Sequence, residues 1–225
     1  MREVELKAVV DDLAERKRKI EAAGAALSFE GKISDRRYDF ASRELTGRDE
    51  VLRTRRYQDR TSTRTYLDWK GPTEMQNGYK MREEFTTPVE HSDSFEKILE
   101  RLGLELTWEI DREISQYELA GAVIRFETYP RMDVLVEVEG EPDAIEAAIE
   151  AIGLPRGMFT SERLADFVNA FEHRTGVRAA ISDRELQNNY SFRDSSEWRT
   201  ALQPTARRAR WWVRGARYEV GRIAT

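Results

Sequence analysis

Charged and apolar side chains alternate along the first strand-like segment of this chain. Glu3, Glu5 and Lys7 are separated by Val4 and Leu6. Successive side chains of a β-strand point to opposite faces, so the three charges share one face. Such a face cannot pack as ordinary apolar core. The chain must therefore fold so that this face either contacts water or lines a functional site.

The same alternation recurs on later strand-like runs. The residues that share a face are Arg53, Arg55 and Tyr57; Asp68 and Lys70; Arg82 and Glu84; Arg125 and Glu127; and Asp133, Glu137 and Glu139. An open sheet with one face in water explains any single strand of this kind. It explains the set less well, because basic residues dominate several strands and carboxylates dominate two others. Closing about eight strands into a barrel would gather both signs of charge around one lumen.

A lumen of this composition suits a divalent metal bound together with a polyanion. Carboxylates hold Mg²⁺ or Mn²⁺ through hard oxygen ligands, while Arg and Lys side chains neutralise a row of phosphates. The chain contains no cysteine, and His91 and His173 are its only imidazoles. Thiolate sites and disulfides are therefore excluded, and we expect a metal held by oxygen.

The turn and helix signals predict an α+β fold. We expect strands near residues 2–10, 27–40, 50–58, 62–70, 79–87, 104–119, 122–129 and 133–139. Helices are expected after Asp11 or Asp12, after Ser92 or Asp93, from Pro142, and before Gly176, since these residue types begin or end helices. The predicted architecture is a closed, antiparallel, eight-stranded β-barrel with helices packed outside, formed by residues 1–176 as one domain.

The last segment, residues 177–225, is predicted to be an Arg-rich appendage. It contains ten Arg, no Lys and five acidic residues, whereas residues 1–176 hold 27 basic and 37 acidic residues, a net charge of −10. The formal net charge of the whole chain is −5, which argues against a bulk nucleic-acid binder. Two interpretations of the appendage stay open: a flexible, disordered tail, or an arm whose Trp and Arg side chains contact nucleic acid or a partner.

No apolar run in the sequence approaches the roughly 20 residues of a membrane-spanning helix. The N-terminus enters a charged strand directly and shows no signal-peptide pattern. We therefore expect a cytoplasmic protein without membrane contact. The oligomeric state is left open.

The segment Glu3-Val-Glu-Leu-Lys7 resembles the Glu-x-Glu-x-Lys signature of the CYTH superfamily. This superfamily, also called triphosphate tunnel metalloenzymes, includes class IV adenylate cyclases, thiamine triphosphatases and inorganic triphosphatases. Further motifs resemble the family's in the same order: Asp35–Asp39 with Arg43–Leu45, Leu52-Arg-Thr-Arg55, Trp69-Lys-Gly-Pro72, Arg82-Glu-Glu84 and Glu137-Val-Glu139. The resemblance covers about residues 2–171. Each motif is short, but their common order makes the resemblance specific.

The resemblance implies a role for each matching charge. It implies Glu3, Glu5, Lys7 and Glu127 as catalytic residues, Glu3, Glu5, Glu137 and Glu139 as metal ligands, and Lys7, Arg53, Arg55, Lys70, Arg82, Arg112 and Arg125 as residues that bind the triphosphate. Two positions depart from the family pattern. Ile114 stands where the family often has a second basic residue after Arg112, so that contact is missing or comes from Arg125. The His-Phe pair that precedes the signature in some cyclases is absent.

Three functions stay open under this resemblance. The first is Mg²⁺- or Mn²⁺-dependent hydrolysis of an inorganic or organic triphosphate, with Lys7 and the arginines stabilising the departing diphosphate. The second is a class IV adenylate cyclase, which converts ATP to cyclic AMP and pyrophosphate. The third is a non-catalytic module that binds polyphosphate or a nucleotide, against which the carboxylates on the first and last strands argue. The missing His-Phe pair favours hydrolysis.

Overall fold

The structure is a computed structural model that describes residues 2–76 and 79–194, with the backbone alone for residues 2, 3, 76, 79 and 80. The strands are β1 (Arg2–Val9), β2 (Ala26–Phe40), β3 (Val51–Gln58), β4 (Thr63–Lys70), β5 (Glu74–Gln76), β6 (Tyr79–Val89), β7 (Leu104–Leu119), β8 (Ala122–Thr128) and β9 (Leu135–Glu139). The helices are α1 (Leu13–Ala22), α2 (Glu44–Gly47), α3 (Ser92–Arg101), α4 (Pro142–Ile152), α5 (Leu164–Thr175) and α6 (Asp183–Leu186), with a 3-10 turn, η1, at Arg156–Met158.

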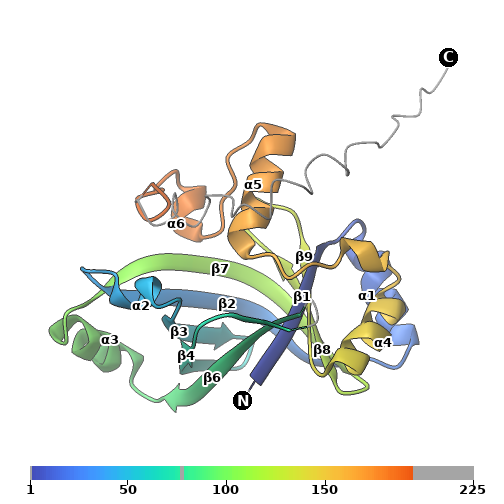
Figure 1. Cartoon of the computed structure of the whole chain (residues 1–225), viewed down its shortest axis with the longest axis horizontal. Coiled ribbons are helices and arrows are strands. Elements are labelled where there is room, and N and C mark those ends of the chain that lie inside the picture. Colours follow the sequence, from blue (N-terminus) through green and yellow to red (C-terminus); the bar gives the residue numbers. More distant parts are fainter. Residues whose placement is uncertain (1, 77–78, 195–225) are drawn as a thin grey trace.

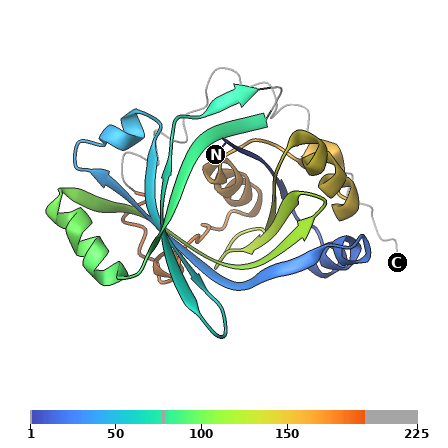
Figure 2. The same cartoon turned by 90° about the horizontal axis from the view of Figure 1, so that it is seen from below.

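Eight of these strands close into an antiparallel barrel. Hydrogen bonds link them in the order β1-β9-β8-β7-β2-β3-β4-β6, and β6 pairs back to β1 to complete the ring. Figure 2 shows the ring of strands from below. The ninth strand, β5, joins the sheet through β6 alone. The closed eight-stranded antiparallel barrel with helices outside confirms the predicted α+β fold.

Over β1, β8 and β9 the barrel is apolar on its outer surface and carries charged residues inside. On β1, Val4, Leu6 and Ala8 are buried in a cluster with residues of α1 and α4, while Glu5 and Lys7 line a pocket in the lumen. The outward residues of β8 and β9 join the same cluster. Burial of apolar surface between the barrel wall and the helices therefore stabilises the fold. Charged groups lie in the interior.

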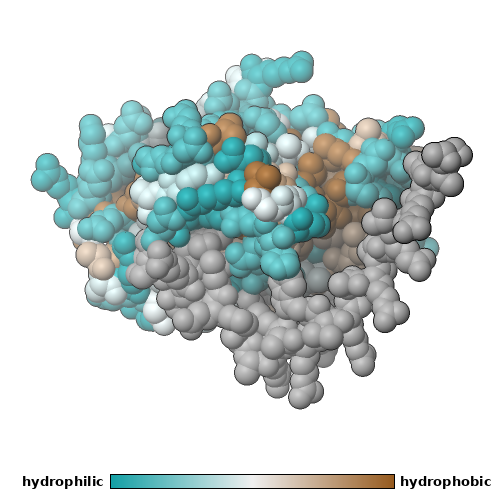
Figure 3. Space-filling model, turned by 90° about the horizontal axis from the view of Figure 1, so that it is seen from above, coloured by the Kyte–Doolittle hydropathy of each residue, from teal (hydrophilic) through white to brown (hydrophobic). Residues whose placement is uncertain are grey.

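Three groups of helices cover different parts of the barrel (Figure 1). Helices α1 and α4 lie side by side, and α1 begins where the Asp12 carboxylate accepts a hydrogen bond from the Glu15 amide at 3.0 Å. Leu99 of α3 packs with Leu104 and with α2 at the start of β7, while α5 packs on a third cluster around Ile110. Hydrophilic side chains dominate the visible face on the α5 and α6 side (Figure 3). No helix in the described part of the chain is long and apolar enough to cross a membrane.

The long elements begin and end within a few residues of the predicted positions. The elements that were not predicted are α2, β5, η1 and α6, each of three or four residues. Segments this short do not complete one hydrophobic period of a helix or a strand face, so their patterns cannot be separated from those of turns.

The described part of the predicted appendage, residues 177–194, packs on the barrel. Ala179, Ala180 and Ile181 are fully buried. The Asp111 amide donates to the Ile181 carbonyl at 2.8 Å, and Ala180 forms a β-bridge with Arg131. Residues 195–225, which include the tryptophans of the predicted arm, lie outside the described residues. The domain boundary near residue 176 stays a prediction.

Candidate active site in the barrel lumen

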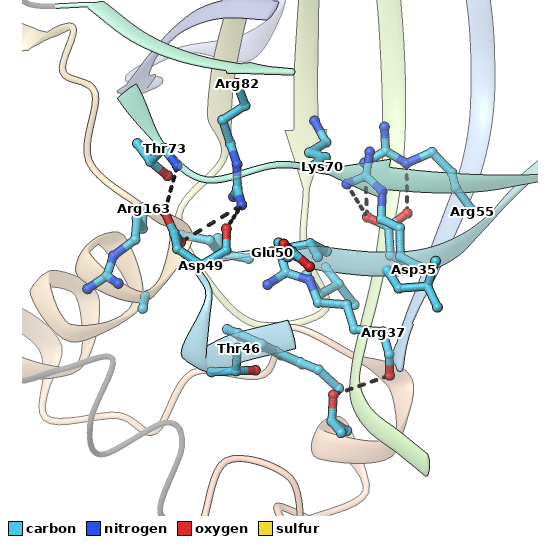
Figure 4. A pocket seen from close by; sticks show the side chains of 18 of the residues that line it. Asp35, Arg37, Thr46, Asp49, Glu50, Arg55, Lys70, Thr73, Arg82 and Arg163 are labelled. Carbon is cyan, nitrogen blue, oxygen red and sulfur yellow. Dashed lines mark hydrogen bonds and ion pairs between the residues drawn. The ribbon is translucent and has the colours of Figure 1, made fainter. Parts of the chain in front are cut away.

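The lumen holds a pocket of about 260 Å³ (Figure 4). All eight barrel strands contribute to its lining, together with the start of α5 and Phe192. The charged residues that line it are the acidic Glu5, Asp35, Asp39, Asp49, Glu50, Glu127, Glu137 and Glu162 and the basic Lys7, Arg37, Arg53, Arg55, Lys70, Arg82, Arg112 and Arg163. Acidic and basic groups thus balance one another around one cavity.

Three carboxylates from β1 and β9 form a cluster. Glu5 and Glu139 lie opposite each other in the β1–β9 register, and one oxygen of each lies within 4.8 Å of an oxygen of Glu137. Like charges placed opposite each other on neighbouring strands destabilise a sheet. Two cations offset this repulsion: Lys7 bonds to Glu5 at 2.9 Å and pairs with Glu137, and Arg125 pairs with Glu137 and, at 3.1 Å, with Glu139.

These pairs hold both kinds of group in their charged forms. Burial alone would lower the pKa of Lys7, but the carboxylates of Glu137, Glu5 and Glu127 raise it above its ordinary value. Burial likewise opposes ionisation of Glu137, yet Lys7 and Arg125 hold its pKa well below the ordinary value. Glu137 therefore remains a carboxylate anion at neutral pH.

The donor set fits a hard divalent cation. All three side chains offer carboxylate oxygens, the ligands that Mg²⁺ and Mn²⁺ prefer. At a Mg–O distance of about 2.1 Å, two ligands lie at most roughly 4.2 Å apart, so the 4.8 Å spread of the cluster would close with small side-chain rotations. Glu5, Glu137 and Glu139 are therefore the candidate metal ligands among the described side chains.

Asp35 on β2 connects three arginines from two neighbouring strands. Its carboxylate accepts from Arg55 Nε and Nη2 at 2.7 and 3.0 Å and from Arg112 Nη1 at 3.1 Å, and Arg53 lies 3.6 Å away. Burial opposes ionisation, but Arg55, Arg112 and Arg53 hold the pKa of Asp35 well below its ordinary value. One fixed carboxylate thus orients a row of guanidinium groups along the lumen.

The basic groups of β3 and β4 are also held by carboxylates. Arg53 Nε donates to Asp68 at 2.7 Å, and Lys70 lies 3.0 Å from Glu84. Both cations are mostly buried. Because each is already neutralised in part, an incoming phosphate would compete with a carboxylate for the same cation.

Arg82 on β6 reaches the rim of the pocket. Its Nε donates to the Gly71 carbonyl at 2.6 Å, and Nη2 bonds to the Asp49 carbonyl and lies 3.8 Å from the Asp49 carboxylate. The Asp49 carboxylate also accepts from the Thr73 amide at 2.7 Å. Figure 4 shows the contacts of Asp49 with Arg82 and Thr73, which join the loop after α2 to β6 and to the turn after β4.

Glu127 on β8 accepts two hydrogen bonds deep in the lumen. Arg112 Nε donates to one carboxylate oxygen at 2.7 Å and the Tyr129 hydroxyl to the other at 2.6 Å. Burial and the Glu127 carboxylate raise the pKa of Tyr129 well above its ordinary value. With both oxygens engaged and almost no exposure, Glu127 fits an anchor for Arg112 better than a proton acceptor.

Arg37 on β2 differs from the other cations of the pocket. Its guanidinium lies 4.6 Å from the centre of the Trp108 ring, and its Nε is buried with no hydrogen-bond partner among the described residues. Burial and the positive charges of Arg53, Arg82 and Arg112 lower the pKa of Arg37 to about 10. It therefore remains charged at neutral pH without a carboxylate of its own.

One wall of the pocket is apolar. It is formed by Trp108 and Ile110 of β7, Leu164 and Ala165 of α5, and Phe192. Ile110 and Ala165 belong to the core cluster beneath α5, and Trp108 and Leu164 pack on it. The pocket thus combines a charged lumen with a wall able to contact an uncharged organic group.

The structure places most of the predicted site residues in this one lumen. Glu5, Lys7, Arg53, Arg55, Lys70, Arg82, Arg112, Glu127 and Glu137 line the pocket. Glu139 and Arg125 join it through the carboxylate cluster. The backbone register sets Glu3 opposite Arg82, but the Glu3 side chain lies outside the described part of the structure. The roles predicted for all these residues stay predictions.

Sequence reasoning missed Arg37, Tyr129, Asp49 and the apolar wall. The signal for Arg37 was present, because Asp35, Arg37 and Asp39 follow the same period of two. The apolar wall had no such signal, since α5 and Phe192 reach the pocket only through tertiary packing.

A model of the CYTH domain family matches residues 1–152 of the chain. Among curated proteins, none matches at a significant level.

Solved structures share the fold at low sequence identity. A candidate adenylate cyclase from Vibrio parahaemolyticus aligns with a TM-score of 0.65 and 19% identity, covering 74% of this chain and 97% of that one. The PH1012 protein of Pyrococcus horikoshii aligns with a TM-score of 0.60 and 17% identity, covering 73% and 98%. A candidate adenylyl cyclase from Hippeastrum, described as having a dominant triphosphatase activity, aligns with a TM-score of 0.55 and 15% identity, covering 78% and 95%.

Proposed function

The chain belongs to the CYTH domain family, and on that premise we propose that it is a divalent-metal-dependent enzyme that hydrolyses a triphosphate in the barrel lumen. Proteins of this family are typically enzymes that act on triphosphates. The observation that carries the proposal is the meeting of a carboxylate cluster with basic residues from several strands around one pocket. A pure anion-binding site would gain nothing from buried carboxylates.

The carboxylate cluster is proposed to hold the metal. Glu5, Glu137 and Glu139 supply the oxygens, and Glu3 is expected to join them through its place on β1. When bound, a Mg²⁺ or Mn²⁺ ion would neutralise phosphate oxygens and lower the pKa of a coordinated water.

The basic residues are proposed to bind and orient the phosphate chain. Arg53, Arg55 and Arg112 lie in a row fixed by Asp35, with Lys70 and Arg82 nearby and Lys7 and Arg125 at the carboxylate cluster. Arginine forks match phosphate oxygens in pairs, while lysine supplies a compact positive charge. The row would hold the chain extended along the lumen, with one end beside the carboxylate cluster.

The proposed hydrolysis transfers the terminal phosphoryl group to water. A water oxygen forms a bond to the terminal phosphorus, the bridging P–O bond breaks, and its electron pair stays on the departing diphosphate. Lys7 and the arginines stabilise that charge, and the proton of the water is released to solvent. In this proposal Glu127 acts by holding Arg112 in place.

A class IV adenylate cyclase is the second candidate, favoured by the apolar wall of the pocket. Trp108, Leu164 and Phe192 offer contacts that a nucleobase could use and that inorganic tripolyphosphate could not. The triphosphatase activity described for the Hippeastrum protein supports hydrolysis as compatible with this barrel. Hydrolysis also needs no group beyond those already gathered in the lumen.

One assay separates these functions. The full chain is incubated with Mg²⁺ or Mn²⁺ and, in turn, tripolyphosphate, ATP and thiamine triphosphate, and the products phosphate, pyrophosphate and cyclic AMP are resolved. We expect metal-dependent release of phosphate. Cyclic AMP with pyrophosphate from ATP would establish the cyclase instead, and tight binding without any turnover would establish a non-catalytic module.

A further inference from the structure

Among the described residues, the cations that line the pocket are paired with one exception. In the described structure, Lys7, Arg53, Arg55, Lys70, Arg82, Arg112 and Arg163 each lie within ion-pair distance of a carboxylate. Arg37 lines the same pocket but forms no ion pair and donates no side-chain hydrogen bond to any described residue. The nearby carboxylates are engaged elsewhere, because Asp35 binds Arg55 and Arg112 and Glu50 binds Arg48 at 3.0 Å.

The backbone holds Arg37 in this position. The β2–β7 register shifts between Arg37 and Tyr38, where Thr107 of β7 is the extra residue and donates from Oγ1 to the Arg37 carbonyl at 3.3 Å. Such bulges commonly redirect a side chain beside a functional site. Here Arg37 lies opposite Trp108 on β7 and opposite Arg53 on β3. The Trp108 ring then supports the guanidinium plane from one side.

This placement is unfavourable for the ligand-free fold. Arg37 and Arg53 are like charges in directly opposed positions, which destabilises a strand pair, and a buried guanidinium nitrogen without a partner loses hydration that nothing replaces. Stacking on Trp108 offsets only part of this cost. If the role of Arg37 were only to cover the Trp108 ring, an apolar side chain would do so without the electrostatic cost.

We propose that Arg37, supported by Trp108, is a further phosphate-binding residue of the pocket, supplying the positive charge that the lumen carboxylates leave uncompensated. The ligand group is an oxyanion of a polyphosphate chain, so this inference rests on the proposed function. Arg37 competes with no internal carboxylate, and its charge is therefore fully available to the ligand. The other cations of the pocket must share theirs.

The test measures binding and stability without turnover. Tripolyphosphate is titrated calorimetrically into the full chain in EDTA, and thermal unfolding is followed with and without tripolyphosphate. The variants are Arg37→Met, Arg37→Lys and the matched control Arg56→Met, which removes the same charge from an exposed position of β3. Arg55→Met serves as the reference for loss of a lumen arginine.

We expect Arg37→Met to weaken tripolyphosphate binding about tenfold or more, which is about 1.4 kcal/mol. Its melting temperature without ligand should equal or exceed that of the wild type. The variant would then lose affinity for tripolyphosphate without losing stability. Arg37→Lys should bind with intermediate affinity, and Arg56→Met should match the wild type.

Two results would overturn the inference. If Arg37→Met and Arg37→Lys both bind tripolyphosphate as tightly as the wild type while Arg55→Met loses binding, then the proposed function stands and Arg37 only supports Trp108. If the wild type binds no tripolyphosphate and turns over no triphosphate, then the proposed function and this inference fail together.

Discussion

At the scale of single residues, two cations share the carboxylates of the cluster. Glu137 pairs with both Lys7 and Arg125, and Arg125 also pairs with Glu139. Removing the charge of Glu137 would leave two buried cations sharing fewer anions. Removing that of Glu139 leaves Arg125 paired with Glu137. Substitutions of these two residues therefore separate an effect on metal binding from an effect on the free energy of unfolding.

We predict that Glu139→Gln lowers metal-dependent turnover by roughly 100-fold or more, because it removes a hard anionic ligand. The free energy of unfolding without metal should change by less than about 1 kcal/mol, since Arg125 keeps a carboxylate partner. Glu137→Gln should instead destabilise the fold by about 3 kcal/mol or more, as expected for breaking buried ion pairs. Steady-state kinetics and urea unfolding of both variants check this. Full activity of Glu139→Gln at low metal concentration would contradict the proposed ligand role.

Asp35 gives a prediction with a defined pH dependence. Asp35→Asn leaves Arg55 without its buried counter-charge and removes one of the two carboxylate partners of Arg112, so the free energy of unfolding should fall by about 3–5 kcal/mol near pH 7. The pKa of Asp35 is lowered in the folded protein. Its stabilisation is therefore complete above the unfolded pKa of about 3.9 and decreases as the pH falls further.

The difference between wild type and Asp35→Asn should accordingly shrink by about 1.4 kcal/mol for each pH unit below about 4. Urea unfolding of both proteins at pH 7, 5 and 3 measures it. A difference that stays constant down to pH 3 would show that Asp35 is not held ionised by the arginines.

At the scale of elements, the strands could be predicted because the inner and outer faces of the barrel differ so strongly in charge. Glu5 and Lys7 alternate with Leu6 and Ala8 on β1, and the structure buries the apolar pair outside and turns the charged pair inward. The sequence predicted that the strands close into a ring, but it did not predict which strands are neighbours in that ring. The pairing of Arg37 with Trp108 depends on a bulge that no residue pattern specified.

The segment after Gly176 was predicted less well than the strands. Its packed part contains a signal that was passed over, since Ser182 and Glu185 have the spacing of a helix N-terminus and the Ser182 hydroxyl accepts from the Glu185 amide at 3.3 Å. The burial of Ile181, by contrast, depends on contacts with the β7 side of the barrel. Such contacts leave no periodic pattern in a short segment.

The packing of residues 177–194 on the barrel leads to a prediction for two truncations. Removal of residues 195–225 should leave turnover within about threefold of the full chain, because every described residue that lines the pocket precedes them. Removal of residues 177–225 should lower the melting temperature by several degrees and raise KM. It takes away Ile181 from the core, Phe192 from the pocket and Arg184 from its bidentate pair with Glu109. Equal melting temperatures for the two truncations would show that residues 177–194 add nothing to the fold.

At the scale of the whole molecule, the fold divides its hydrophobic core between the outer side of the barrel wall and one side of the lumen pocket. Helices α1 and α4 cover apolar residues outside the wall, while α5 packs on apolar residues that include Trp108 and Ile110 of the pocket. The lumen is thereby free to hold eight acidic and eight basic residues around one pocket. Most of its internal charges are already paired, so the pocket itself has little net charge.

This balance predicts that metal and triphosphate bind together. A metal ion alone must compete with Lys7 and Arg125 for the carboxylates, and a triphosphate alone must compete with Asp35, Asp68 and Glu84 for the cations. When both bind, each neutralises the groups that the other displaces. The coupling must be reciprocal, since each ligand changes the affinity of the other by the same factor.

We therefore expect tripolyphosphate to raise the affinity for Mn²⁺ at least about tenfold, equivalent to about 1.4 kcal/mol of coupling. Calorimetric titration of Mn²⁺ with and without bound tripolyphosphate measures one side of the cycle, and titration of tripolyphosphate with and without Mn²⁺ measures the other. A slowly hydrolysed imidotriphosphate keeps the ligand intact during these titrations. The coupling must be corrected for the complex that Mn²⁺ and tripolyphosphate form in solution, and it should decrease in Glu139→Gln, which weakens the metal side alone. Independent binding of the two ligands after that correction would contradict the shared charge balance, and with it the proposal that one lumen holds both.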